Sequence, residues 1–121
     1  MAVTVTNQLN PVGARIVNDS NTGATAADNT IGTTGTLYAV ELDNTANSSA
    51  VYFKMADALT ATSGTTAATL VLVCPASTKM SYIFPTGIGF SAGFCHWCVT
   101  GAAESETTGP SLAVVARYVT S

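Results

Sequence analysis

The chain has 121 residues with a formal net charge of −3, and only 9% of its residues are charged while 47% are hydrophobic. Its four cations, Arg15, Lys54, Lys79 and Arg117, are scattered along the sequence, whereas nucleic-acid binding requires a cluster of Lys and Arg against the phosphates. No apolar run approaches the ~20 residues of a membrane-spanning helix. These features exclude nucleic acid and membrane as expected partners, and they predict one domain with its own core.

The first 35 residues carry the weakest structural signals. Short alternating or apolar stretches predict strands over residues 3–6 and 15–17. Residues 18–35 are rich in Asn, Thr, Gly and Ala, which predicts a long loop or an arm that a partner orders. We therefore expect an irregular N-terminal arm over residues 1–35 and a β core over residues 36–121, the two forming one domain.

From residue 36 onward, strands are indicated by apolar–polar alternation or by short apolar runs bounded by turn residues. A cluster of Asp, Asn and Ser over residues 43–49 predicts a turn held by side-chain hydrogen bonds, and a Thr/Ala-rich loop is expected over residues 57–68. No segment keeps a helical period. The predicted strands cover residues 36–43, 50–56, 69–74, 78–84, 88–90, 94–100 and 112–119. With about seven to eight antiparallel strands, the sequence predicts an all-β fold, either a β-sandwich or a jelly roll.

The string Cys95-His96-Trp97-Cys98 is the one pattern that suggests chemistry. Its Cys-x-x-Cys spacing with a His, and Cys74 as a fourth ligand, would suit zinc, and the same spacing occurs in redox motifs. On a strand, however, alternate side chains face opposite sides, so the sulfur of Cys95 points away from that of Cys98. Three cysteines also fit reduced thiols better than a disulfide framework. We therefore expect core packing, with Cys74, Cys95, His96 and Cys98 left as candidate metal ligands.

No catalytic constellation or cofactor site is expected. His96 is the only histidine, and no Gly-x-Ser-x-Gly nucleophile motif or phosphate-binding glycine pattern occurs. The acidic residues Asp43, Asp57, Glu104 and Glu106 lie in predicted loops or at strand ends. We expect Glu104 and Glu106 to be solvated, with a weak cation site as the alternative.

The low charge has a consequence for the surface. Thr and Ala together supply 39 of the 121 residues, so the outer strand faces are expected to be covered by small and weakly polar groups. Such a surface solubilises a free monomer poorly, and we expect much of it to be covered in an assembly. A soluble monomer with a Thr-coated surface is the alternative.

Several short patterns in residues 36–119 resemble small structural proteins of tailed bacteriophages. The resemblance rests on the order in which they occur: TLYAV, DNTAN, VYFK, FPTGIGF, GF, TGAAES and VARY. It implies a capsid cement (decoration) protein, which is a non-enzymatic β-sandwich that often forms a homotrimer. Such a protein lies on the outer surface of the virion head and stabilises it by bridging major capsid protein subunits. The Cys-His-Trp-Cys string departs from the ordinary strand residues of that pattern.

Other roles remain open at the level of the sequence. A tail or head-completion protein would also be small, β-rich and oligomeric. A carbohydrate-binding module of a phage fibre would use Tyr38, Tyr52 or Trp97 as a sugar platform, although core packing is the commoner role of such aromatics. The N-terminus lacks the basic and apolar regions of a signal peptide, so we expect assembly in the host cytoplasm.

Overall fold

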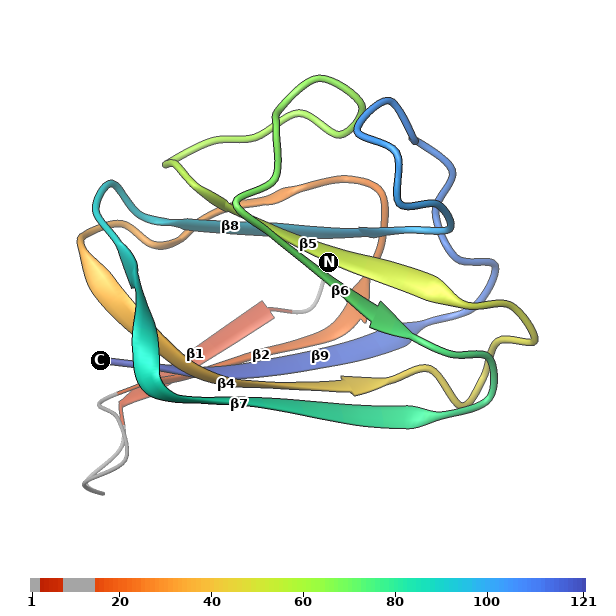
Figure 1. The fold of residues 1–121 in the computed structure, drawn as a ribbon, viewed down its shortest axis with the longest axis horizontal. Helices are drawn as coiled ribbons and strands as arrows, with labels where there is room; N and C mark the ends of the chain where they lie inside the picture. The colour runs from red at the N-terminus through yellow and green to blue at the C-terminus, as the bar shows by residue number, and fades with distance from the viewer. Residues whose placement is uncertain (1–2, 8–14) are drawn as a thin grey trace.

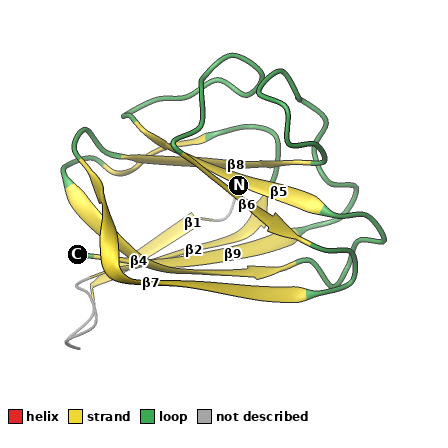
Figure 2. Cartoon of the chain, viewed as in Figure 1, coloured by secondary structure: helices red, strands yellow, loops and turns green. Residues whose placement is uncertain are grey.

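The computed structural model describes residues 3–7 and 15–121. The described residues form nine strands and no helix, as Figure 2 shows. The strands are β1 (Val3–Asn7), β2 (Arg15–Thr22), β3 (Ala27–Ile31), β4 (Gly35–Asp43), β5 (Val51–Asp57), β6 (Leu70–Cys74), β7 (Lys79–Phe90), β8 (Phe94–Val99) and β9 (Val114–Thr120). The predicted all-β class is confirmed.

The strands form two antiparallel sheets that face each other across the core (Figure 1). One sheet has five strands in the order β1-β2-β9-β4-β7, and the other has four in the order β3-β8-β5-β6. The buried apolar side chains between them include Val17, Leu42, Phe53, Phe90 and Val114. The molecule is therefore a β-sandwich.

The connectivity is that of a jelly roll. Strand β5 pairs with β6, β4 with β7, β3 with β8 and β2 with β9. These pairings make residues 15–120 one long hairpin, closed by the loop of residues 58–69 and rolled so that its pairs alternate between the two sheets. This is the eight-stranded, double-sheet arrangement of a jelly roll. Strand β1 extends the larger sheet beyond it.

The expected loop or arm over residues 18–35 is wrong. Strand β2 occupies most of its first part, between β1 and β9, and β3 forms an edge of the smaller sheet. The sequence here lacks the apolar alternation of a strand because polar residues occupy core positions on β2: Asp19 and Thr22 are both buried. The parts of the expected arm at residues 1–2 and 8–14 lie outside the described residues.

Two irregularities explain other differences from the sequence pattern. A register shift on β4 between Leu37 and Ala39 places Leu37 in the same core as Val40, although strict alternation would put them on opposite faces. The predicted corner at residues 84–87 is an irregularity of the same pairing, inside the long strand β7. The structure has nine strands where seven to eight were expected: β3 was not anticipated, whereas the predicted segments 78–84 and 88–90 form the single strand β7.

Replacing Gly87 by Ala should destabilise the fold. Gly87 has φ of 76°, where an L side chain is strained, and a Cβ there would overlap the methyl group of Thr36. We expect a loss of about 1–3 kcal/mol in the free energy of unfolding, measured by urea denaturation. Gly89→Ala is the matched control, since a Cβ at that position meets nothing within 4 Å. Equal effects of the two substitutions would contradict the conformation assigned to Gly87.

Candidate functional site

The Cys95–Cys98 string lies on β8, between β3 and β5 in the smaller sheet, and all four side chains are buried. Cys98 belongs to the main core between the sheets. Cys95 and Trp97 belong to a second apolar cluster on the outer face of this sheet, which is packed against Ala residues of the loops. The two sulfurs therefore face opposite sides of the sheet, as the alternation predicted.

His96 is the centre of a buried chain of hydrogen bonds. Its Nε2 lies 2.7 Å from Oδ2 of Asp19, and its Nδ1 lies 2.9 Å from the hydroxyl of Tyr118. That hydroxyl is 2.7 Å from Oγ1 of Thr30, which donates to the carbonyl of Phe94 at 2.9 Å. Asp19, His96 and Tyr118 have 0% exposure, so the chain is closed to substrates from solvent.

This chain of hydrogen bonds joins the two sheets. Asp19 on β2 and Tyr118 on β9 belong to the larger sheet, whereas His96 on β8 and Thr30 on β3 belong to the smaller one. Burial raises the pKa of the Tyr118 hydroxyl well above its ordinary value, so it stays protonated and able to donate. The contact between Asp19 and His96 resembles that of a catalytic His–Asp pair. Because both side chains are buried between the sheets, we assign the pair to the core.

The three cysteines are free, buried thiols. Burial raises the pKa of Cys98 to about 12, and it also raises the pKa of Cys74 and of Cys95. A reactive or metal-binding cysteine needs the thiolate form, which these surroundings disfavour. Among the residues that the structure describes, no group of three or more His, Cys, Asp or Glu side chains is placed to hold a metal ion.

Two of the predicted carboxylates organise loops. Asp57 accepts hydrogen bonds from the backbone N–H groups of Ser91 at 2.9 Å and Ala92 at 2.7 Å, and these bonds lower its pKa. Oε1 of Glu106 accepts from the N–H groups of Thr107 and Thr108, which lowers the pKa of Glu106 in the same way. Both carboxylates thus accept hydrogen bonds from turn N–H groups in place of a backbone carbonyl.

Of the other two carboxylates, Asp43 makes hydrogen bonds within a turn, whereas Glu104 is exposed. Asp43 accepts from the N–H and the hydroxyl of Thr45, which lower its pKa, and it lies 3.8 Å from Nζ of Lys79. This is the side-chain-held turn that the sequence predicted. Glu104 is exposed and borders a hollow on the outer face of the smaller sheet. The structure brings none of the four carboxylates next to His96.

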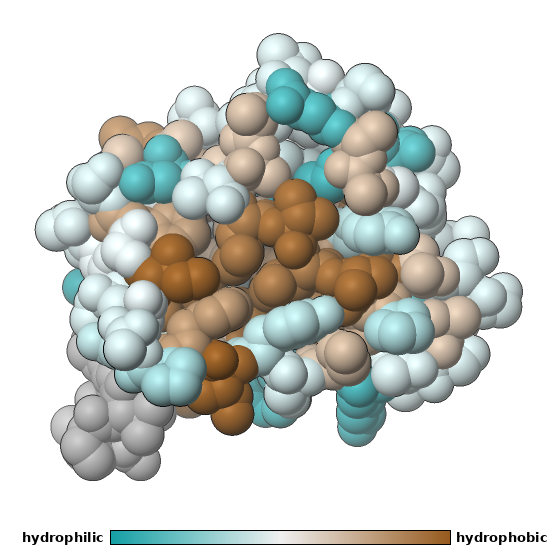
Figure 3. Space-filling model, viewed as in Figure 1, coloured by the Kyte–Doolittle hydropathy of each residue, from teal (hydrophilic) through white to brown (hydrophobic). Residues whose placement is uncertain are grey.

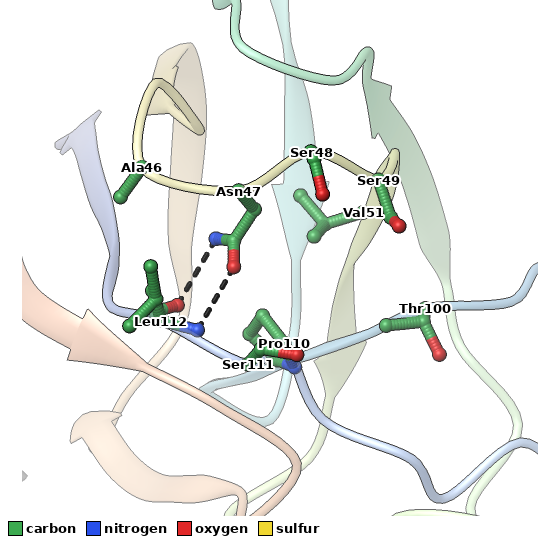
Figure 4. A pocket seen from close by; sticks show the side chains of 9 residues that line it. All are labelled: Ala46, Asn47, Ser48, Ser49, Val51, Thr100, Pro110, Ser111 and Leu112. Carbon is green, nitrogen blue, oxygen red and sulfur yellow. Dashed lines mark hydrogen bonds between the residues drawn. The ribbon is translucent and has the colours of Figure 1, made fainter.

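A second hollow, of about 170 Å³, lies where the β4–β5 turn meets the segment before β9 (Figure 4). Asn47 spans it: its Nδ2 donates to the carbonyl of Leu112 at 3.0 Å, and its Oδ1 accepts from the N–H of Leu112 at 2.8 Å. The lining holds no ionisable side chain: it consists of Ala46, Asn47, Ser48, Ser49, Val51, Thr100, Pro110, Ser111 and Leu112. The paired amide fastens two loops, and short-range sequence patterns do not reveal this contact between distant segments.

The most distinctive surface is an apolar area on β6 and β7, the two edge strands on the same side of the sandwich. Figure 3 shows hydrophobic side chains gathered over this part of the molecule. We call it the β6–β7 face. Val71 and Val73 alternate with buried Leu72 and Cys74 and point outward from the smaller sheet, and Ile83 points outward from the larger sheet. Between them, at the open edge of the sandwich, lie partly buried residues that pack against the core: Leu70, Met80, Phe84 and Ile88. Ile83 is the most open, with 73% of its surface exposed.

The aromatic residues offer little for sugar stacking. Trp97 is 1% exposed, so it packs in the interior as expected and does not offer its ring to a sugar. Tyr82 donates its hydroxyl to the carbonyl of Val73 at 2.5 Å, which links β7 to β6. Tyr38 and Tyr52 are partly buried, and none of the hollows described above includes either ring in its lining.

No protein-family model, curated protein or solved structure matches this chain. Within the described ranges, no helix is long and apolar enough to cross a membrane.

Removing the Asp19 carboxylate should be strongly destabilising. Asp19→Ala leaves Nε2 of His96 without its partner in the core, and we expect a loss of about 3 kcal/mol in the free energy of unfolding. Lys79→Ala, which breaks the exposed pair with Asp43, should change it by no more than about 0.5 kcal/mol. Urea denaturation of both variants measures the difference. A loss for Asp19→Ala as small as that for Lys79→Ala would show that the buried pair contributes no net stability.

The Cys98 thiol should make the fold sensitive to alkali. The unfolded chain releases this proton near the ordinary pKa of 9.0, whereas the folded protein holds it to about 12. Stability should therefore fall as pH rises from 9 to 12, by up to ~1.4 kcal/mol per pH unit. Cys98→Ala should remove this part of the slope in urea titrations at increasing pH.

A disulfide-exchange reagent at pH 8 should label no cysteine in the folded protein and all three in urea, and rapid labelling of the folded protein would contradict the assigned burial.

Proposed function

We propose that this chain is a non-enzymatic virion structural protein, and specifically a capsid cement protein of a tailed bacteriophage. In this role it associates as a homotrimer on the outer surface of the head and bridges major capsid protein subunits. The observation that carries the proposal is the β6–β7 face. A free monomer would leave three aliphatic side chains exposed there, on two neighbouring edge strands.

Three properties support this role over a catalytic one. The His–Asp pair and the three thiols are buried in the described fold, and the hollow crossed by Asn47 has no ionisable lining residue. The surface carries few charges, as suits a protein that is covered by neighbours. The patterns in residues 36–119 resemble phage structural proteins.

The physical task of a cement protein matches such a surface. A cement protein stabilises the joints between capsid subunits by burying surface area across them. A standard interface of ~1,600 Å² gives useful but limited affinity. A trimer that contacts several capsid subunits at once gains effective concentration at each further site. Edge strands add a second mode, because their open backbone groups can pair with a neighbouring strand.

Charged substitutions on the β6–β7 face test the proposal. Ile83→Asp and Val73→Asp should each weaken self-association and the binding to heads of the encoding phage by at least tenfold, because a carboxylate is desolvated in the interface. Native mass and co-sedimentation with heads that lack the protein measure the two effects. Thr4→Asp adds the same charge at an exposed position on β1, the opposite edge of the larger sheet, and should have no effect.

Each alternative has its own outcome in the same experiments. Wild-type binding by both face variants would contradict the role assigned to this face. A ring of six or more copies that does not bind heads would favour a tail or head-completion protein. Binding to host polysaccharide instead of heads would favour a fibre module.

A further inference from the structure

Lys54 is a buried lysine on the outer face of the smaller sheet. Only 2% of its surface is exposed. Its Nζ donates to the carbonyl of Ala103 at 2.7 Å, and the described part of the chain gives it no ion pair. An ammonium group has three N–H donors, so two of them lack a protein acceptor there. A buried charge with unused donors calls for an acceptor from outside the chain.

The space for such an acceptor lies beside Lys54. A hollow of about 170 Å³ is lined by Lys54, Thr66, Ala68, Val71, Ala102 and Glu104. Its walls come from the β5–β6 loop and the β8–β9 loop, which lie side by side above the smaller sheet (Figure 1). A cavity of about 150 Å³ holds a molecule as large as benzene. The hollow therefore fits a small organic ligand.

A second unused donor lies on the same face. Lys54 on β5 is the cross-strand partner of Trp97 on β8, so both side chains emerge on the outer side of the sheet. The indole N–H of Trp97 is buried and has no hydrogen-bond partner in the described residues. Lys54 and Trp97 thus leave N–H donors without acceptors on this face of the sheet. Glu104 on the border of the hollow is hydrogen-bonded to neither of them in the described structure, which favours a ligand that brings acceptor oxygens.

The nearby carboxylates leave this need unmet. Glu106 is close enough for the charge of Lys54 to contribute to its lowered pKa, but the main cause is its hydrogen bond from Thr108. Its Oε1 is already used by backbone N–H groups of its own loop. Glu104 is exposed at the border of the hollow and makes no ion pair with Lys54 in the described structure.

We propose that this hollow binds a small monocarboxylate, with its oxygens on the free N–H donors of Lys54. The hydroxyl of Thr66 accepts from the N–H of Thr62 at 2.8 Å, and it keeps its proton to donate to the same carboxylate. The methyl groups of Ala68, Val71 and Ala102 receive the alkyl part. A second carboxylate on the ligand would be repelled by Glu104 and Glu106, which sets the preference for a single one.

Acetate is the probe, with chloride at equal ionic strength as its control. Nuclear magnetic resonance of the ¹⁵N-labelled whole chain follows the Lys54 ammonium and the indole N–H of Trp97, the only tryptophan. We expect saturable shifts of both signals with acetate, with a Kd on the order of 10 mM as suits one charge-assisted contact. Chloride should produce no saturable shift. Equal, non-saturating responses to the two salts would overturn the proposal.

Substitutions locate the site. Lys54→Met, which keeps an unbranched apolar stem and removes the ammonium group, should weaken acetate binding at least tenfold, and unchanged binding would overturn the assignment. Lys79→Met removes an exposed lysine and should leave it unchanged. Glu104→Gln should tighten it by removing the repelling charge, whereas weaker binding would contradict a simple carboxylate site. If Lys54→Met does not fold, the wild-type ammonium signal decides the question. None of these outcomes depends on binding to phage heads.

Discussion

The hydrogen-bond chain from Asp19 through His96 to Tyr118 is the constraint on which the packing of this sandwich depends. Apolar contacts between two sheets are non-directional and tolerate small shifts. A buried polar chain does not, because each donor that loses its acceptor in a dry core costs free energy. The three residues lie on β2, β8 and β9, so the chain fixes how the first, the penultimate and the last strand of the jelly roll meet. We infer that it specifies the register between the sheets.

The same interaction explains where sequence reasoning failed. Strand β2 was not predicted beyond residue 17 because Asp19, a residue typical of loops, stands at a core position. Its suitability depends on His96, which lies 77 positions further along the chain. Short-range periodicity carries no information on such a partner. Where core positions are apolar and regular, as along β5, the sequence predicted the strand within one or two residues.

For the Cys95–Cys98 string, the direction of each side chain was predictable from the sequence, but the residues that contact them were not. Strand alternation correctly placed Cys95 and Cys98 on opposite faces. It gave no indication that His96 would be enclosed by Asp19 and Tyr118, or that loops would bury Lys54. Whether loops cover a sheet face depends on the tertiary structure. The loops here contain too few large apolar residues for the sequence to predict that coverage. The contact of Asn47 with Leu112 was hidden for the same reason.

Between the two sheets, Asp19 and His96 are hydrogen-bonded to each other, and burial keeps Cys98 and Tyr118 protonated. This is why we place the proposed function on the surface. The hydrogen bonds of Asp57, Glu106 and Asp43 keep the loops in place at the ends of the sandwich. The edge strands β6 and β7 instead leave aliphatic side chains in water. That contrast between a closed interior and an apolar edge is the basis of our proposal that copies of this chain cover one another.

The native mass of the purified protein, measured over a range of concentrations by sedimentation velocity, tests this most directly. We expect a closed trimer that persists on dilution and has the β6–β7 face buried between its subunits. A monomer at every concentration would contradict the claim that copies of this chain cover one another's apolar edge.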